Sequence, residues 1–128
     1  MGRTIRWLKE AEILAIHDQQ LLNYGGMPGL RDSGLLQSAL ASPRTAYGYG
    51  VTELAHLAAK LAFGLISNHP FFDGNKRTAL VASVVFLRLN RRTFNAPEAQ
   101  MVTTLVNVAA GDMSEQELLD FYQKFTSP

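Results

Sequence analysis

The sequence contains no cysteine among its 128 residues. This absence excludes disulfide bonds, thiolate nucleophiles and zinc sites built on cysteine, and it suits a reducing compartment such as the cytosol. Net charge is also nearly absent, because 12 basic residues face 11 acidic ones and leave +1. Binding to nucleic acid through a broad basic face is therefore not expected.

The sequence also lacks a long apolar run. The longest strongly apolar stretch, residues 79–87, contains a serine and is far shorter than the about 20 residues that span a bilayer. The first ten residues hold two arginines and are not followed by an apolar segment of signal-peptide length. We therefore expect a cytoplasmic protein that does not contact a membrane.

The composition that is present fits one folded domain over residues 1–128, since 47% of the residues are hydrophobic and 18% are charged. Nearly every apolar segment has helical spacing. Strand-like patterns occur only at residues 5–8 and 92–95, so the predicted fold class is all-α. The predicted helices cover residues 9–23, a short segment from Asp32 or Ser33 that Pro43 closes, a segment after Thr52, residues 75–90, a segment from Pro97 to Gly111, and residues 115–125.

The segment at residues 75–90 differs from the others because its apolar residues surround most of its circumference. A helix that is apolar on nearly all sides is buried on nearly all sides. We therefore predict that this helix is central and that about five others wrap around it.

The residues that carry chemistry precede and open this helix, in the string HPFFDGNKRTAL from His69 to Leu80. His69 offers a proton acceptor, and Asp73 offers an oxygen ligand suited to Mg²⁺. Gly74 allows a ligand to approach the backbone closely. Lys76 and Arg77 lie in the first helical turn, where free N–H groups already favour an anion. Together these groups indicate phosphoryl-group chemistry on a hydroxyl.

Each residue also has a structural interpretation. A lone histidine is more often structural than catalytic, and Asp73 or Asn75 could simply cap the helix. Lys76 and Arg77 could form a solvated first turn, although two cations at a helix N-terminus are unfavourable unless an anion is present. His17 and Asp18 look like an ordinary surface or half-buried pair.

The string resembles the signature of Fic/Doc proteins, His-x-Phe-x-Asp/Glu-Gly-Asn-x-Arg. The segments AIHDQQLLNYGGMPGLRDSGLLQSAL and ALVASVVFLRLN are similar to the Doc (death-on-curing) branch of this family. The resemblance implies a single Fic/Doc-type helical domain. It also implies roles for the motif residues: His69 as general base, Phe71 as the anchor of the loop, Asp73 as the Mg²⁺ ligand, and Gly74, Asn75, Lys76 and Arg77 as phosphate-binding residues.

Two departures from the signature favour the Doc branch. Fic proteins that transfer adenylyl groups typically have glycine in place of Lys76 and a second arginine in place of Leu80, whereas Doc toxins lack both. The resemblance then implies a kinase that uses ATP and Mg²⁺ to phosphorylate a threonine of elongation factor Tu and so blocks translation. One position departs from the Doc branch: Val81, directly after Leu80, stands where the resemblance implies an asparagine. An adenylyl transferase of the Fic type and a non-catalytic binding module on the same scaffold remain the alternatives.

The resemblance also implies two kinds of protein contact. Some family members restrain themselves with a helix in which glutamate precedes glycine or asparagine, a pair that this sequence lacks. We therefore expect a separate antitoxin, a small protein that folds on binding. Family members also use a flap beside the site to align a target segment. The turn-rich stretch predicted to form this flap, or else a plain loop, consists of Pro43, Arg44, Thr45, Ala46, Tyr47, Gly48, Tyr49 and Gly50.

Overall fold

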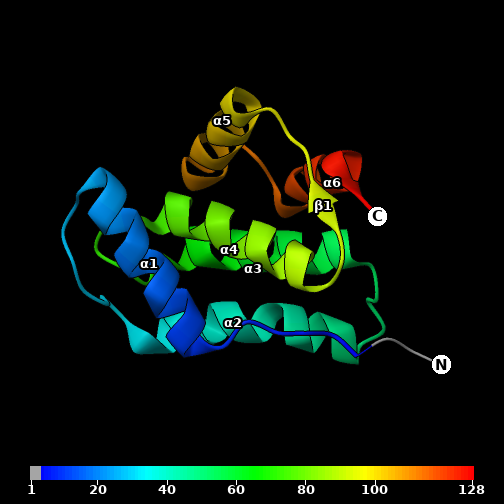
Figure 1. Cartoon of the computed structure of the whole chain (residues 1–128), viewed down its shortest axis with the longest axis horizontal. Helices are drawn as coiled ribbons and strands as arrows, with labels where there is room; N and C mark the ends of the chain where they lie inside the picture. Colours follow the sequence, from blue (N-terminus) through cyan, green and yellow to red (C-terminus); the bar gives the residue numbers. More distant parts are fainter. Residues whose placement is uncertain (1–3) are drawn as a thin grey trace.

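The structure, a computed structural model, describes residues 4–128 and is mostly helical, which confirms the predicted fold class. In the described residues the only sheet has two strands of two residues each (Figure 1). The elements are α1 (Glu10–Tyr24), α2 (Ser33–Gly48), α3 (Leu54–Asn68), α4 (Asn75–Leu89), β1 (Thr93–Phe94), α5 (Glu98–Ala109), α6 (Glu115–Phe125) and β2 (Thr126–Ser127).

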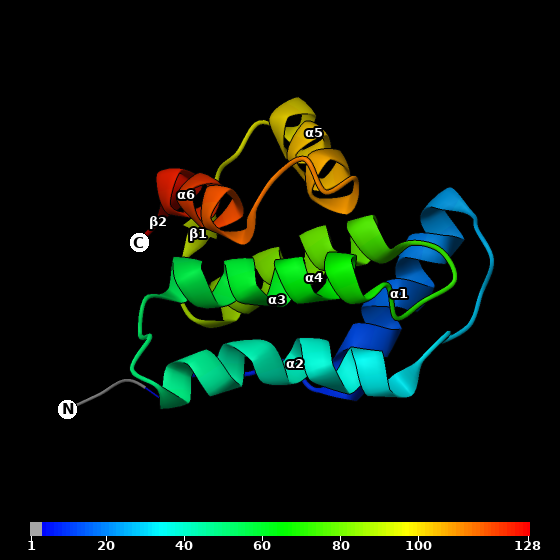
Figure 2. The ribbon, with the colours of Figure 1, turned by 180° about the vertical axis from the view of Figure 1, so that it is seen from behind.

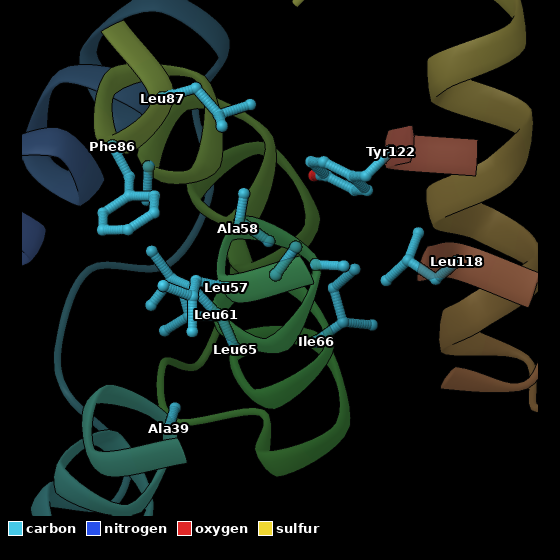
Figure 3. Close-up of a cluster of buried hydrophobic side chains, with 14 of the residues drawn as sticks. Ala39, Leu57, Ala58, Leu61, Leu65, Ile66, Phe86, Leu87, Leu118 and Tyr122 are labelled. Atoms are coloured by element: carbon cyan, nitrogen blue, oxygen red, sulfur yellow. The ribbon is translucent and has the colours of Figure 1, made fainter. Parts of the chain in front are cut away.

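Helix α3 occupies the centre of the molecule. It lies between α2 on one side and α5 and α6 on the other, and it packs along α4 (Figure 2). Figure 3 shows its side chains between those of α2, α4 and α6. Its inward-facing residues are Leu57, Ala58, Leu61, Ala62, Leu65 and Ile66, all less than 5% exposed. Their spacing gives α3 the broad apolar stripe that a central helix needs.

Helix α4 is also continuous, but it is less completely covered than its sequence predicts. Phe86 and Leu87 are buried, as are the small residues Ala79, Ala82 and Ser83. The opposite face is only half-buried and borders a shallow groove towards β1 and α5. The half-buried residues on this face are Leu80, Val81, Val84 and Val85.

The prediction that Pro43 closes the second helix is wrong: α2 continues to Gly48 with Pro43 inside it. Proline removes one helical hydrogen bond, at a cost of about 3 kcal/mol or more. Tertiary contacts outweigh this cost: Pro43 is buried, and the last turn packs against Trp7 through the Tyr47 ring and the Arg44 guanidinium. The stretch at residues 43–48 is therefore helix, with only Tyr49 and Gly50 following as a turn.

The two predicted strands have different outcomes. Thr93 and Phe94 do form β1, which pairs antiparallel with β2. Residues 5–8 form no strand, because their backbone is held by a side chain: the amide group of Asn90 bonds both the N–H and the carbonyl of Arg6. In the described part of the chain, no helix has the length and apolarity needed to cross a membrane.

Candidate functional site

The motif forms the loop between α3 and α4, and a second loop lies alongside it. This neighbouring loop, residues 25–32, connects α1 to α2. Leu30 forms an antiparallel bridge with Phe71, and the Phe72 N–H donates to the Gly29 carbonyl at 3.3 Å. None of the site residues predicted from the sequence lies in residues 25–32, where the sequence indicated only a helix start at Asp32 or Ser33.

Phe71 and Asn75 fix the middle of the motif loop. The Phe71 side chain is 1% exposed, as an anchoring role requires. The side-chain amide of Asn75 accepts from the Phe71 N–H at 3.0 Å and donates to the Phe71 carbonyl at 2.9 Å. Both polar atoms of the Asn75 side chain are thus engaged inside the loop. A contribution of Asn75 to phosphate binding would come from its backbone N–H.

His17 supports the same loop from α1, which corrects its interpretation as a surface or half-buried residue. It is only 2% exposed. Its ring stacks on Phe71 with centroids 3.7 Å apart, and its Nε2 lies 2.8 Å from the Asp73 carbonyl oxygen, where Nε2–H donates. The spacing in the sequence does indicate burial of His17. It follows Ile13 by four residues and precedes Gln20 by three, which places the three on one helix face, and all three are buried.

Asp73 does not cap α4. The N-cap residue is Gly74, in the left-handed conformation with φ 81°, and no side chain bonds the cap. The Oδ2 atom of Asp73 instead accepts from the Met27 N–H at 2.6 Å. Gly26 permits this approach, because a Cβ there would lie 3.1 Å from the Asp73 Cβ. The structure thus excludes the interpretation of Asp73 as a simple N-cap.

The first turn of α4 opens into a cleft of about 450 Å³, within the usual range for small-molecule sites. Asp73, Lys76 and Arg77 line it on one side, all with exposed side chains. The Arg77 guanidinium lies 4.3 Å from the centre of the Tyr24 ring. The wall is completed by Leu80 and by three apolar residues of α5, Val102, Leu105 and Val106. The cleft therefore has a cationic end and an apolar side. Val81 lines the separate shallow groove.

His69 lies at the other end of the loop and is not among the residues that line the cleft. It is exposed and is the C-cap of α3, with φ 51° and ψ 56°. The structure therefore brings Asp73, Gly74, Asn75, Lys76 and Arg77 together, with His69 beside them on the surface.

The segment predicted as a flap, residues 43–50, does not lie beside this loop. The N-terminal end of α2 contacts the loop, since the Asp32 N–H donates to the Pro70 carbonyl. Residue 43 lies ten residues further along this helix, or about 15 Å, and Figure 2 shows the two ends on opposite sides of the molecule. The segment beside the motif is residues 25–32.

The groups in the cleft fit a magnesium–nucleotide complex. Mg²⁺ in such complexes is held by one or two carboxylates together with phosphate oxygens and water. Asp73 supplies one exposed carboxylate at the edge of the cleft, beside the two cations. The described residues contain no group of three or more acidic, histidine or cysteine side chains that would form a cage made only of protein ligands.

One family profile and two known proteins are similar to this chain. The profile of the Fic/DOC family matches residues 7–87, which include the motif loop and its neighbouring loop. "Protein kinase doc" of Escherichia phage P1 is 32% identical over 118 residues, covering 91% of this chain and 92% of that protein. "Toxin Doc" of Mycolicibacterium smegmatis is 44% identical over 70 residues, about half of each chain.

Proposed function

Because this chain belongs to the Fic/Doc family and resembles its Doc branch, we propose that it is an ATP-dependent phosphotransferase that modifies a hydroxyl group on a protein. One observation carries this proposal most directly. The N-terminus of α4 has no side-chain cap, and two exposed cations and a carboxylate surround it in one cleft. Such a helix end has unused N–H groups and attracts phosphate.

Phosphate binding would divide between backbone and side chains. The N–H groups of Asn75, Lys76 and Arg77 belong to the first turn, which has no partners within the helix. The side chains of Lys76 and Arg77 add positive charge at the same place. Mg²⁺ held by Asp73 would offset the charge of the phosphate chain. These groups orient the terminal phosphate and stabilise the charge that develops on it during transfer.

His69 would act as the general base at the surface end of the loop. Its imidazole takes the proton of the target hydroxyl as the hydroxyl oxygen bonds to the γ-phosphorus. The bond from the γ-phosphorus to the bridging oxygen breaks, and ADP leaves with that oxygen. The exposure of His69 is consistent with a substrate as large as a protein segment.

Lys76 and Leu80 favour phosphoryl over adenylyl transfer. Lys76 adds bulk and a positive charge at the helix end, which suits a terminal phosphate with three oxygens. An α-phosphate is flanked by groups on both sides and needs more room. Leu80, one turn later in the same cleft, offers no donor to a longer phosphate chain.

We further propose that the protein is a toxin whose target is a threonine of elongation factor Tu, and that an antitoxin that folds on binding restrains it. The names of the two relatives support the toxin and kinase parts of this proposal. The target segment would lie against residues 25–32 and the adjoining motif loop. Three large side chains are 36–57% exposed there: Met27 and Leu30 of the neighbouring loop and Phe72 of the motif loop.

The test is transfer from ATP labelled on either the α- or the γ-phosphate, with purified elongation factor Tu as acceptor and intact mass spectrometry of the product. We expect the γ-label and a phosphoryl mass increment on the acceptor. An adenylyl increment would support the Fic-type alternative, and tight complex formation without label would support a binding module.

The variant Lys76→Gly provides a prediction specific to this site. Removing the cation should lower phosphoryl transfer by about tenfold or more, since an aligned charge in a transition state contributes a few kcal/mol. The larger space should allow a trace of adenylyl transfer. The matched control is Lys60→Gln, which changes a lysine on α3 outside the cleft, paired with Glu115. Unchanged transfer by Lys76→Gly would remove Lys76 from the mechanism.

A further inference from the structure

The backbone of His69 has a conformation that needs support. Its φ of 51° and ψ of 56° lie in the left-handed region, and Arg91 is the only other non-glycine residue with positive φ in the part of the chain that the structure describes. The residue after a helix often adopts this conformation, but it is usually glycine or asparagine, because a side chain makes it unfavourable. The orientation of the His69 imidazole depends on this backbone conformation.

Arg31 binds the backbone on both sides of His69. Its Nε–H donates to the His69 carbonyl at 2.7 Å, and its Nη2 donates to the Asn68 carbonyl at 3.0 Å. Its own backbone N–H donates to the Pro70 carbonyl at 2.7 Å. Three consecutive carbonyls are thus held by one residue that lies outside the motif, in the neighbouring loop.

The chemistry of these contacts requires arginine. The last carbonyls of a helix have no partner within the helix, and a cation is favoured there. The planar guanidinium donates from two of its nitrogens at once in a fixed geometry, whereas the ammonium of lysine is a single point. Lysine would keep the charge but lose the paired contact to residues 68 and 69.

We propose that Arg31 is a positioning residue for the general base: it holds the backbone of His69 so that the imidazole faces the target hydroxyl. This inference rests on the proposed function of His69. Arg31 touches neither the cleft nor its phosphate-binding residues. Its effect should therefore appear in the rate of transfer and not in the binding of the nucleotide.

The experiment compares Arg31→Lys and Arg31→Gln with the parent protein. We expect kcat to fall by about 10- to 100-fold, the size of effect that a displaced catalytic group produces. The dissociation constant of Mg–ATP, measured by calorimetry, should stay within about twofold of the parent value. The control is Arg88→Gln, which changes an exposed arginine in the last turn of α4 and should transfer at the parent rate.

A double variant separates positioning from general stability. In a His69→Ala background, Arg31→Gln should lower the remaining rate no further, because the group that Arg31 positions is already gone. Rates are expressed per folded protein, determined by circular dichroism, and Arg31→Lys provides the comparison if Arg31→Gln folds poorly. A multiplicative further loss, or a parallel fall in Mg–ATP affinity, would overturn the proposal.

A structural readout keeps this test independent of the proposed function. Backbone chemical shifts and couplings at residue 69 should change in Arg31→Gln and report loss of the positive φ. If residue 69 keeps its left-handed conformation in that variant, Arg31 is not the positioning residue, whatever the protein transfers. If the parent protein transfers no phosphate while residue 69 changes as expected, the proposed function fails and the contact stands.

Discussion

At the level of single residues, the side chain of Asn75 shows that a motif position can stabilise the loop itself. Its amide group completes a pair of hydrogen bonds with the backbone of Phe71, much as a neighbouring strand would. A buried amide with both partners satisfied is stable, and losing one partner leaves a costly buried polar group. The hydrogen bonds of Asn75 therefore hold the loop in one conformation without a ligand.

His69→Ala should leave the fold intact and nearly abolish transfer. The side chain is exposed, so the free energy of unfolding should change by less than about 0.5 kcal/mol. Loss of a general base typically costs 10²–10⁴ in rate. Stopped-time assays with labelled ATP and thermal melts measure the two effects. His56→Ala, which removes a histidine of α3 outside the site, is the control. A variant that keeps the parent rate would exclude His69 as the base.

The sequence predicts the chemical groups of the site better than their supports. Asp73, Lys76 and Arg77 could be recognised because their types and spacing at a helix start are unusual without a ligand. The spacing of His17 indicates its burial, but the supporting roles of His17 and Arg31 could not be recognised. Each acts on a partner distant in sequence: His17 on Asp73, and Arg31 on Asn68 and His69. Contacts over 37 to 56 residues leave no periodic pattern in the chain.

At the level of elements, local signals predicted most helix ends to within two residues, and they were wrong at α2. Helix α1 was predicted at residues 9–23 and ends at Tyr24, where the Gly25 N–H donates to the Leu21 carbonyl. Helix α6 covers residues 115–125 as predicted, and Ser114 and Glu117 form a capping box at its start. Pro43 is also a strong local signal, but the packing of α2 on α3 and on Trp7 outweighs it. Such packing becomes visible only once the helices are placed together.

The contact between α2 and α3 depends on Gly64. A Cβ at this position would lie 3.1 Å from the Cα of Ala39, so the two helices would have to separate. Gly64→Ala should therefore lower the free energy of unfolding by about 1 kcal/mol or more, despite the better helix propensity of alanine. Chemical denaturation measures this change. Gly48→Ala is the control, since nothing lies within 4 Å of its Cβ. A more stable Gly64→Ala protein would contradict this account.

The contact between α4 and α6 contains a buried polar pair. The Ser83 hydroxyl donates to the Leu80 carbonyl, so the Tyr122 hydroxyl donates to Ser83 Oγ at 2.6 Å. Tyr122→Phe removes this bond and should lower the free energy of unfolding by about 1 kcal/mol near neutral pH, without affecting transfer.

The same pair predicts that the free energy of unfolding depends on pH in the alkaline range. Burial raises the pKa of Tyr122 above its ordinary value of 10.0, and the smaller effect of the Ser83 hydrogen bond opposes this. A raised pKa in the folded state means that the stabilisation is fully present below pH 10 and is lost as the pH rises above it. Unfolding measured from pH 8 to 11 should show the advantage of the parent protein over Tyr122→Phe shrinking above pH 10. A constant difference would show that the phenol does not titrate with unfolding.

At the level of the whole molecule, occupancy of the cleft should stabilise the fold. A ligand at 100 times its dissociation constant contributes about 2.7 kcal/mol, which corresponds to several degrees in Tm for a domain of this size. We expect Mg–ATP to raise Tm in the parent protein and to do so weakly in Asp73→Asn. Asparagine keeps an acceptor for the Met27 N–H but removes the charge that would hold Mg²⁺.

The control for this measurement is Asp32→Asn. Asp32 caps α2 through the Leu35 N–H, and asparagine caps equally well, so the Mg–ATP shift should equal that of the parent protein. If Asp73→Asn shows the full shift, Asp73 is not the metal ligand.

The two sides of the cleft come from different stretches of the chain. Its cationic end and Leu80 lie within residues 7–87, the part matched by the family profile. The other apolar residues of its wall, Val102, Leu105 and Val106, come from α5, which follows that part. If the cleft binds the nucleotide as proposed, we expect exchanges at Val102 or Val106 to alter which nucleotide fits without changing the transfer step. Under that proposal the choice of donor and the reaction could be altered independently.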